Sequence, residues 1–360
     1  MSKKKIYFIA PYPHNAAPSQ RFRFEQYFSF LEQEGYEVKL FPFLDEKTWK
    51  TLYSDGKTIQ KISGVIRSFF KRFFLLFSLQ KADFIFIHRE ASHLGPPIFE
   101  WLIAKVLRRK YIYDFDDAIW LPNYSESNAK FHRLKAYWKV NYCMKWAYQV
   151  SAGNQFLADY ARQFNSNIVI IPTTIDTENY HTGNAEYYPE KIVLGWTGTH
   201  TTMRYLDALV PVFNELNTKF EYTIRVISNE KPAFNLPNLE FIKWNKESEI
   251  EDLKSFSIGI MPLVKDQWSE GKCGFKGLQY MSLGIPTIMS PVGVNTEIID
   301  HGTNGIIAST DEEWKQALEM MIVNAEMRKQ FGRNGKQTII DRYSVLSQNR
   351  HYLNLFNINK

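Results

Sequence analysis

Cysteine is scarce in this chain of 360 residues, which contains only Cys143 and Cys273. The two lie far apart in the sequence and belong to no paired motif, which argues against a disulfide framework and against a zinc site. A chain with so few cysteines suits a reducing compartment, so we predict a cytoplasmic location.

Long apolar runs are also missing. The apolar run after Lys5 ends before Pro11, which makes it too short for a signal peptide. No stretch approaches about 18 apolar residues, so no segment is predicted to cross a membrane.

The chain also has no large excess of charge of either sign, since its net charge is only +6. The basic clusters are short and come with no nucleic-acid motif, so a nucleic-acid partner is not expected. The small positive excess remains compatible with an acidic substrate or an anionic membrane surface. Apolar residues make up 44% of the chain and charged residues 23%, as in globular proteins, and the length suits two domains.

Strand-like apolar runs alternate with helix-like segments in the first half of the chain. The predicted strands cover residues 5–10, 36–42, 82–88, 111–115, 150–152 and 168–171. The predicted helices cover 21–34 and 98–107. This alternation predicts a parallel sheet with helices on both faces.

A polar linker at 172–189 interrupts the pattern, which then starts again. The second set of strands is predicted at 191–196, 222–227, 239–241, 258–262 and 286–290. Its helices are predicted at 203–216, 247–255, 275–283 and 310–325. The sequence therefore predicts an α/β protein of two Rossmann-like domains whose parallel sheets face each other across a cleft.

The first candidate site is the segment GWTGTHTT at 195–202, where a strand ends and a helix begins. The free backbone N–H groups around Gly198 and Thr199, with the positive end of the helix dipole, can bind an anion. The segment matches neither G-x-G-x-x-G nor the P-loop pattern, so a plain strand-to-helix turn with a threonine cap is equally consistent.

A second candidate site lies between Gly274 and Gly284, which bound a short predicted helix. Lys276 is in the first turn, where the helix dipole disfavours a cation unless an anion shares the site. Gln279 lies three residues further, on the same helix face. The Lys276 ammonium could bind phosphates and the Gln279 amide could bind ribose hydroxyls, which together would form a site for a nucleoside diphosphate. The alternative is that both are solvated surface residues.

A third candidate is the carboxylate-rich segment YDFDDAIW at 113–120, which follows a predicted strand. Neighbouring carboxylates are costly unless a cation, a proton or sugar hydroxyls share the site. We assign Asp116 and Asp117 to acceptor binding or positioning, with a loop in which Asp117 caps a helix as the alternative. The tripeptide His88-Arg89-Glu90, at the end of the previous strand, is an accessory candidate.

The segment 59–79 is both basic and strongly apolar, with Ile62, Ile66, Phe69, Phe70, Phe73 and Phe77 near helical spacing. A helix packed on the core is the default interpretation. The alternative is a helix that docks on an anionic membrane, because rings can enter the lipid interface while lysines and arginines meet lipid charges.

Several of these segments together resemble glycosyltransferase family 4, whose members are retaining enzymes of GT-B fold. The most specific stretch is PLVKDQWSEGKCGFKGLQYMSLGIPTIMSPVGVNTEII at 262–299, followed by HGTNGIIA at 301–308. GYEVKLF at 35–41, GWTGT at 195–199 and RYS at 342–344 extend the likeness over most of the chain.

The resemblance implies specific roles for residues. Lys276 matches the lysine that contacts the donor diphosphate, and Gln279 stands where relatives usually carry a ribose-binding acid. The first loop, at 11–21, lacks the Gly-Gly pair of many relatives, so Arg21 and Arg23 are candidates to supply positive charge there, with surface residues of an amphipathic helix as the alternative. Trp244 is a candidate to stack on the base, with core burial as the alternative. We expect Lys276, Asp116 and Asp117 to be the catalytic residues.

The resemblance also implies domains at 1–180 for the acceptor and 181–340 for the nucleotide-sugar, with a helix at 341–360 packing back toward the first domain. No metal or other cofactor is expected, because the family is metal-independent. The expected partners are a nucleotide-sugar donor and a glycan or lipid-linked acceptor, in cell-surface polysaccharide or glycoconjugate synthesis. A GT-B-fold nucleotide-sugar epimerase and a non-catalytic nucleotide- or sugar-binding subunit are the alternatives.

Overall fold

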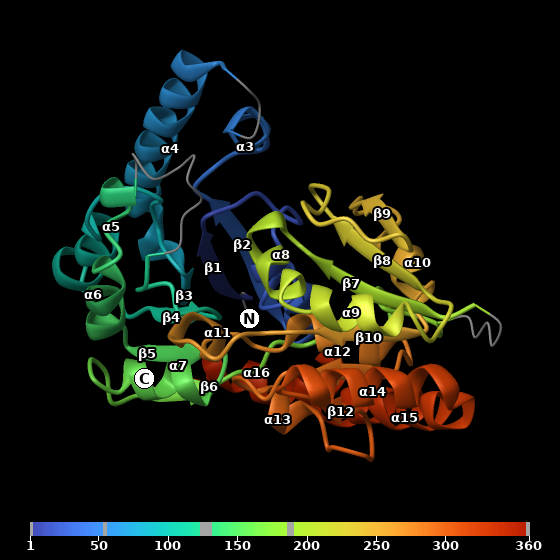
Figure 1. The fold of residues 1–360 in the computed structure, drawn as a ribbon. Helices are drawn as coiled ribbons and strands as arrows, with labels where there is room; N and C mark the ends of the chain where they lie inside the picture. The colour runs from blue at the N-terminus through green and yellow to red at the C-terminus, as the bar shows by residue number, and fades with distance from the viewer. Residues whose placement is uncertain (1–2, 53–55, 123–131, 186–190, 358–360) are drawn as a thin grey trace. The chain divides into compact units, whose positions relative to one another are not determined.

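The computed structural model describes residues 3–52, 56–122, 132–185 and 191–357, and the chain divides into two compact units (Figure 1). The first unit contains residues 1–173 and 349–360, and the second contains 174–348. The sequence had put these boundaries at 180 and 341. The structure places the boundaries earlier and later than this, after residues 173 and 348. Ile175 and Ser344, which lie just inside the two ends of the second unit, pair with each other in a parallel bridge.

A parallel sheet of six strands forms the centre of the first unit, in the order β2-β1-β3-β4-β5-β6. The order changes direction between the neighbours β1 and β3. The strands are β1 (Lys4–Ala10), β2 (Tyr36–Pro42), β3 (Phe84–His88), β4 (Ile112–Phe115), β5 (Gln149–Ala152) and β6 (Ile168–Ile170).

Helices surround this sheet. The α-helices are α1 (Pro18–Arg21), α2 (Phe28–Gln33), α3 (Glu46–Leu52), α4 (Thr58–Ser78), α5 (Ile98–Trp101), α6 (Lys139–Trp146), α7 (Gln155–Ala161) and α16 (Val345–Leu353), which begins in the second unit. The shorter 3₁₀ and π segments are η1 (Glu25–Tyr27), η2 (Leu79–Lys81), η3 (Leu102–Val106), η5 (His132–Lys135) and η7 (Asn354–Phe356). The end of the chain packs on the first unit, where Tyr352 stacks on Tyr27 with ring centroids 4.0 Å apart.

The single helix predicted at 21–34 is wrong, because the structure breaks it into α1, η1 and α2. Phe24 has φ −138°, outside the helical range. Arg23 beside it bonds the buried Asp114 and the Ile171 carbonyl, so tertiary contacts override the local helical spacing at this place.

The second unit has a parallel sheet of six strands in the order β12-β11-β10-β7-β8-β9. Its order changes direction between β7 and β10, and ligands bind at the carboxyl ends of strands at such a point in open α/β sheets. The strands are β7 (Val193–Gly198), β8 (Thr223–Ser228), β9 (Leu239–Lys243), β10 (Ile258–Met261), β11 (Thr287–Met289) and β12 (Ile306–Ile307).

The helices of the second unit are α8 (His200–Asp207), α9 (Val210–Leu216), α10 (Glu249–Lys254), α11 (Gln267–Glu270), α12 (Phe275–Ser282), α13 (Asn295–Ile298), α14 (Asp311–Val323), α15 (Ala325–Thr338) and the π segment η6 (Ile339–Tyr343). The one helix predicted at 203–216 is two, because Pro211 lies in the first turn of α9 and cannot continue a helix.

Apolar side chains alternate between the two faces of this sheet. Leu194 of β7 and Val226 of β8 pack with α8, α9 and α14 on one face. Val193 and Ile227, their neighbours, pack with α10 and α12 on the other face. Such burial on both faces explains why these strands read as nearly continuous apolar runs. Among the described residues, no helix is long and apolar enough to cross a membrane.

Candidate functional site

Lys276 lies in the first turn of α12, which begins after Gly274. Gly274 has φ +68°, and a Cβ there would lie 2.3 Å from the Ile298 side chain, so both backbone and space require glycine. The hydroxyl of Tyr280, further along α12, accepts a hydrogen bond of 2.9 Å from the Thr197 N–H. Helix α12 is thereby held against β7.

The ring of Trp196 connects Lys276 with the end of β7. The Lys276 Nζ lies 5.6 Å from the centre of this ring. A Cβ on Gly198 would come within 2.6 Å of Trp196 Cη2, so the backbone at Gly198 lies directly against the ring. The ammonium and the β7–α8 turn therefore belong to one place at the carboxyl edge, between β7 and β10.

Thr199 occupies the N-cap position of α8 in extended conformation and is exposed. Its side chain makes no capping hydrogen bond and contacts Thr201 Oγ1 at 2.8 Å instead. The N–H of His200 is already bonded to Asn229 Oδ1 at 2.9 Å. Fewer amides of this turn are therefore available to an anion than the sequence indicated.

Gln279 is buried, with 2% of its surface exposed. Its Nε2 lies 3.3 Å from Nε2 of His181, a residue of the segment that precedes β7. No pattern in the sequence indicated this histidine contact. The ribose role of Gln279 stays a prediction.

Trp244 follows β9 and is half-buried against the apolar cluster beneath α10 and α12. Its indole N–H donates a 3.2 Å hydrogen bond to Glu249, which also accepts one of 2.7 Å from the Tyr180 hydroxyl. Tyr180 precedes His181, so a polar chain leads from Trp244 to Gln279. Base stacking by Trp244 remains a prediction.

In the first unit, Arg89 binds both predicted acceptor carboxylates. Its Nε donates to Asp116 Oδ1 and its Nη2 to Asp117 Oδ2, each at 2.7 Å. Arg89 follows β3 and has φ +58°, a left-handed conformation that is uncommon outside glycine. Asp117 does not cap a helix, since the described residues after it form turns. The accessory candidate Arg89 thus becomes the central residue of this group.

These contacts shift the ionisation of the group. Burial raises the pKa of Asp116, but the Arg89 charge outweighs it and holds that pKa below its ordinary value. Burial likewise opposes the charge on Arg89, whose pKa is nevertheless raised by the two carboxylates. The Asp116 carboxyl group is therefore suited to accept hydrogen bonds from hydroxyls and poorly suited to release or capture a proton near neutral pH.

Asp114, the third carboxylate, is structural. It is fully buried and contacts Arg23, His88 Nδ1 at 2.8 Å and the Ser151 hydroxyl at 2.7 Å. Burial disfavours its charge, yet Arg23 and His88 keep the pKa of Asp114 well below its ordinary value. The alternative of Arg23 and Arg21 as surface residues of an amphipathic helix is wrong, because both are buried.

Arg21 ends α1, with its guanidinium 4.9 Å from the centre of the Phe22 ring. The first loop beside it is held by side chains in place of glycines. Gln20 Nε2 donates to the carbonyl of Tyr12 at 3.0 Å, and Glu25 accepts from the N–H of Asn15 at 2.8 Å. Donor binding by Arg21 stays a prediction.

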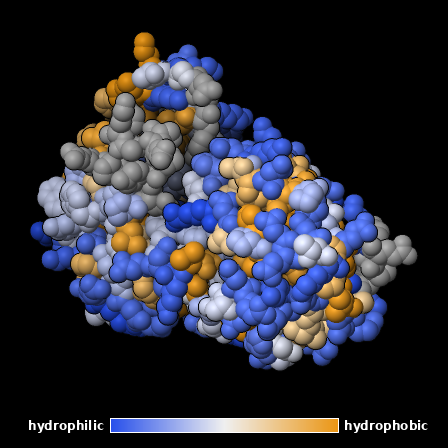
Figure 2. All heavy atoms as spheres, viewed as in Figure 1, coloured by the Kyte–Doolittle hydropathy of each residue, from blue (hydrophilic) through white to orange (hydrophobic). Residues whose placement is uncertain are grey.

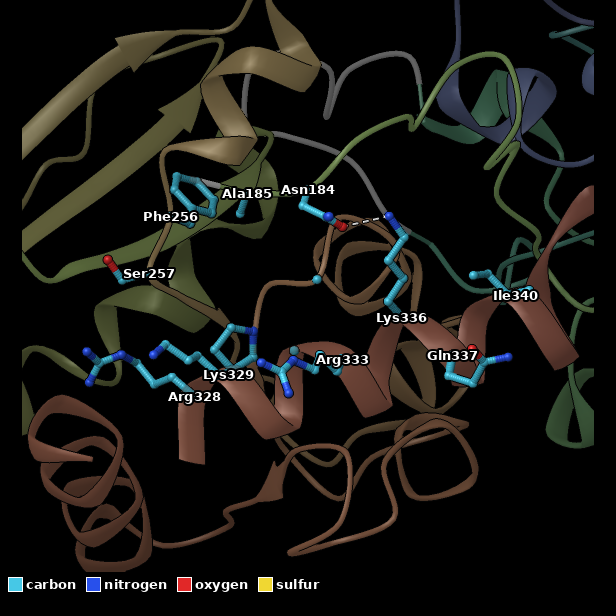
Figure 3. A pocket seen from close by; sticks show the side chains of 13 residues that line it. Asn184, Ala185, Phe256, Ser257, Arg328, Lys329, Arg333, Lys336, Gln337 and Ile340 are labelled. Atoms are coloured by element: carbon cyan, nitrogen blue, oxygen red, sulfur yellow. Dashed lines mark hydrogen bonds between the residues drawn. The ribbon is translucent and has the colours of Figure 1, made fainter. Parts of the chain in front are cut away.

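A cavity of about 480 Å³ lies elsewhere in the second unit (Figure 3). Arg328, Lys329, Arg333 and Lys336 of α15 line one wall, and Lys336 Nζ donates to Asn184 Oδ1 at 2.7 Å. Ser257 and Pro286, which directly precede β10 and β11, line another part. The cavity is therefore at the amino edge of the sheet, opposite the edge that carries Lys276.

Residues 191–324 match the family described as "Glycosyl transferases group 1". An uncharacterized glycosyltransferase of Methanocaldococcus jannaschii is 26% identical over 149 residues, which cover 39% of this chain and 41% of that protein. The chain thus aligns with about two fifths of this curated relative.

Solved structures share the fold over nearly the whole chain. Sucrose-phosphate synthase from Thermosynechococcus elongatus superposes with a TM-score of 0.69 at 11% identity, covering 99% of this chain and 100% of the other. Anabaena HepE in complex with UDP and glucose gives 0.65 at 12% identity, with 99% and 100% covered. The catalytic domain of Arabidopsis thaliana starch synthase IV bound to ADP and acarbose gives 0.66 at 10% identity, with 99% of each chain covered.

The two parallel six-stranded units define the GT-B fold, as the sequence predicted. Within this fold, residues 191–324 match the group 1 glycosyltransferase family. This match confirms the group 1 part of the resemblance drawn from the sequence, and the narrower assignment to family 4 stays a prediction.

Proposed function

We propose that this chain is a retaining glycosyltransferase that moves a sugar from a nucleoside-diphosphate-sugar to a glycan or lipid-linked acceptor. The observation that carries the proposal is the position of Lys276, whose ammonium adjoins Trp196 and the β7–α8 turn at the switch point of the second sheet. The UDP and ADP in the HepE and starch synthase IV structures support a nucleoside diphosphate as the donor's leaving group.

The chemistry follows from charge. As the glycosidic bond to the diphosphate breaks, negative charge gathers on the leaving nucleotide. Lys276, fixed by the packing of α12 on β7, offers a positive charge that needs no rearrangement of solvent during the reaction. A donor phosphate oxygen takes the acceptor proton in this proposal, so no protein nucleophile is needed. The reaction as proposed uses no metal ion, and activity should persist in a chelator.

We assign acceptor binding to the first unit. Asp116 and Asp117 carry oxygens that can accept hydrogen bonds from sugar hydroxyls, and Arg89 orients both carboxylates and keeps Asp116 charged. Their role in the proposal is to position the acceptor and not to transfer its proton. Asp116, with its lowered pKa, is a weak base. Two buried thiols, Cys143 and Cys273, support a reducing cytoplasmic setting for cell-surface polysaccharide or glycoconjugate synthesis.

The test begins with ligand binding by the full chain. UDP, ADP and GDP are screened by thermal shift, since a ligand that binds the native state raises the melting temperature. Nucleotide release is then measured with the matching nucleotide-sugars and a glycan panel. We expect Lys276→Ala to lower the rate by about 10²–10³, the usual cost of one strong charge-stabilising donor.

The matched control is Lys329→Ala, which removes a half-buried lysine paired with Glu326 on α15 of the same unit. Its turnover should equal that of the unchanged chain. Near-normal turnover of Lys276→Ala would refute the assignment. An isomerised donor sugar without acceptor would point to an epimerase, and nucleotide binding without release or isomerisation would point to a non-catalytic binding subunit.

A further inference from the structure

Helix α4 carries a continuous apolar stripe that faces solvent. Its members are between 48% and 84% exposed and recur at helical spacing along the whole helix: Ile59, Ile62, Ile66, Phe70, Phe73, Phe74 and Phe77. Apolar side chains also reach the surface over α4 at the top of Figure 2. A solvent-exposed stripe of this size on a globular chain marks an interaction surface.

The opposite face of α4 is the one that packs on the first unit. Its buried residues are largely small or polar: Gly64, Ser68, Arg72, Leu75 and Leu76. Arg72 donates hydrogen bonds to three backbone carbonyls at 2.8, 2.9 and 3.1 Å. A Cβ on Gly64 would lie 2.6 Å from the Thr48 side chain, so α3 and α4 are in close contact there.

These contacts fix the rotation of α4 about its own axis. Turning the apolar stripe inward would expose Leu75 and Leu76 and would break the hydrogen bonds of the buried Arg72 guanidinium. The default expectation of a core-packing helix is therefore wrong for the stripe: the helix packs on the core with its other face.

Positive charge predominates around the stripe. Residues 57–81 contain no aspartate or glutamate, and besides the buried Arg72 they contain five basic residues: Lys57, Lys61, Arg67, Lys71 and Lys81. One carboxylate from outside the segment, Asp45, pairs with both Arg67 at 3.4 Å and Lys71 at 2.9 Å. The surface around the stripe thus remains positive, which complements an anionic partner.

We propose that the stripe of α4 inserts into the surface of an anionic lipid bilayer and holds the chain there peripherally. Exposed phenylalanines and isoleucines enter the boundary between headgroups and acyl chains, and the flanking cations meet lipid phosphates. A second copy of the chain fits this surface less well, because two stripes face to face would bring their cations together. The proposal stands independently of the transferase reaction, since lipid binding is measured without turnover.

The test is vesicle flotation of the full chain. One set of vesicles contains about 30% phosphatidylglycerol in phosphatidylcholine, and the other contains phosphatidylcholine alone. We expect strong recovery with the anionic vesicles and weak recovery with the neutral ones. The affinity of the triple variant F70S/F74S/F77S for the anionic vesicles should be at least about tenfold lower than that of the parent. Its melting curve should match that of the parent, because these three side chains are exposed.

The matched control is M320S/V323S/L346S, which removes three exposed apolar side chains from the second unit and should bind as the parent does. Recovery near zero with both vesicle types would overturn the proposal, as would an equal loss in the control variant. A dimer seen by light scattering without lipid, and lost in F70S/F74S/F77S, would assign the stripe to a second copy instead.

Discussion

Replacing Asp114 by Asn tests the buried network beneath the acceptor carboxylates. In the structure, this carboxylate neutralises Arg23, whose side chain is 1% exposed, and accepts hydrogen bonds from His88 and Ser151. The amide would leave the guanidinium charged, buried and without its carboxylate. Removing one partner of a buried ion pair costs about 3–5 kcal/mol, mainly because the other charge stays uncompensated.

The loss should depend on pH with a definite sign. The native pKa of Asp114 is lowered from its ordinary value by Arg23 and His88, against the effect of burial. The stability that its carboxylate contributes is therefore fully present above the unfolded-state pKa of about 3.9. It disappears as the pH falls from there toward the lowered native pKa. The difference between parent and Asp114→Asn should shrink over the same range.

Thermal unfolding with hydrogen exchange measures both effects. For a unit of this size, 1 kcal/mol corresponds to roughly 2–4 °C, so the first unit should melt about 6–20 °C lower at neutral pH. Amides of β4 and β5 should lose protection, while those of β7 in the second unit should not. Asp159→Asn, which breaks an exposed pair with Arg162, should change little. A shift below about 2 °C for Asp114→Asn would refute the reasoning.

Two further changes test the carboxyl edges of the two sheets. Gly198→Ala places a Cβ within 2.6 Å of the Trp196 ring. It should therefore destabilise the second unit by about 1–3 kcal/mol and weaken nucleoside diphosphate binding. An unchanged free energy of unfolding by denaturant, with unchanged nucleotide affinity by calorimetry, would contradict this. In Arg89→Lys, the lysine ammonium cannot bind Asp116 and Asp117 together as the guanidinium does. The KM for the acceptor should therefore rise roughly 10–100-fold, while the affinity for the donor stays constant. An equal loss of donor affinity would argue against an acceptor role.

The sequence predicted the architecture well, because parallel strands buried on both faces read as apolar runs and helices between them follow local spacing. Gly274, Lys276 and the end of β7 were identified for the same reason: each depends on a turn whose residue requirements are local. The interruption at Arg23 and Phe24 was missed because it depends on long-range contacts of Arg23 that override the local helical spacing.

Partnerships across long sequence distances could not be predicted. His181 lies 98 residues from Gln279, and Asp114 lies 91 residues from Arg23. Nothing in the neighbouring residues specifies such a contact, because it arises only when strands and their connections come together. The tripeptide after β3 was a usable signal for Arg89, but its two carboxylate partners became evident only in the folded unit.

Helix α4 shows most clearly what the sequence determines and what only the tertiary structure decides. Sequence periodicity determined that an amphipathic helix forms here and that one of its faces is apolar, since spacing alone defines a stripe. Which face meets the protein was decided by tertiary packing. The hydrogen bonds of Arg72 and the close approach at Gly64 fix the opposite face inward, so the apolar face remains in contact with solvent.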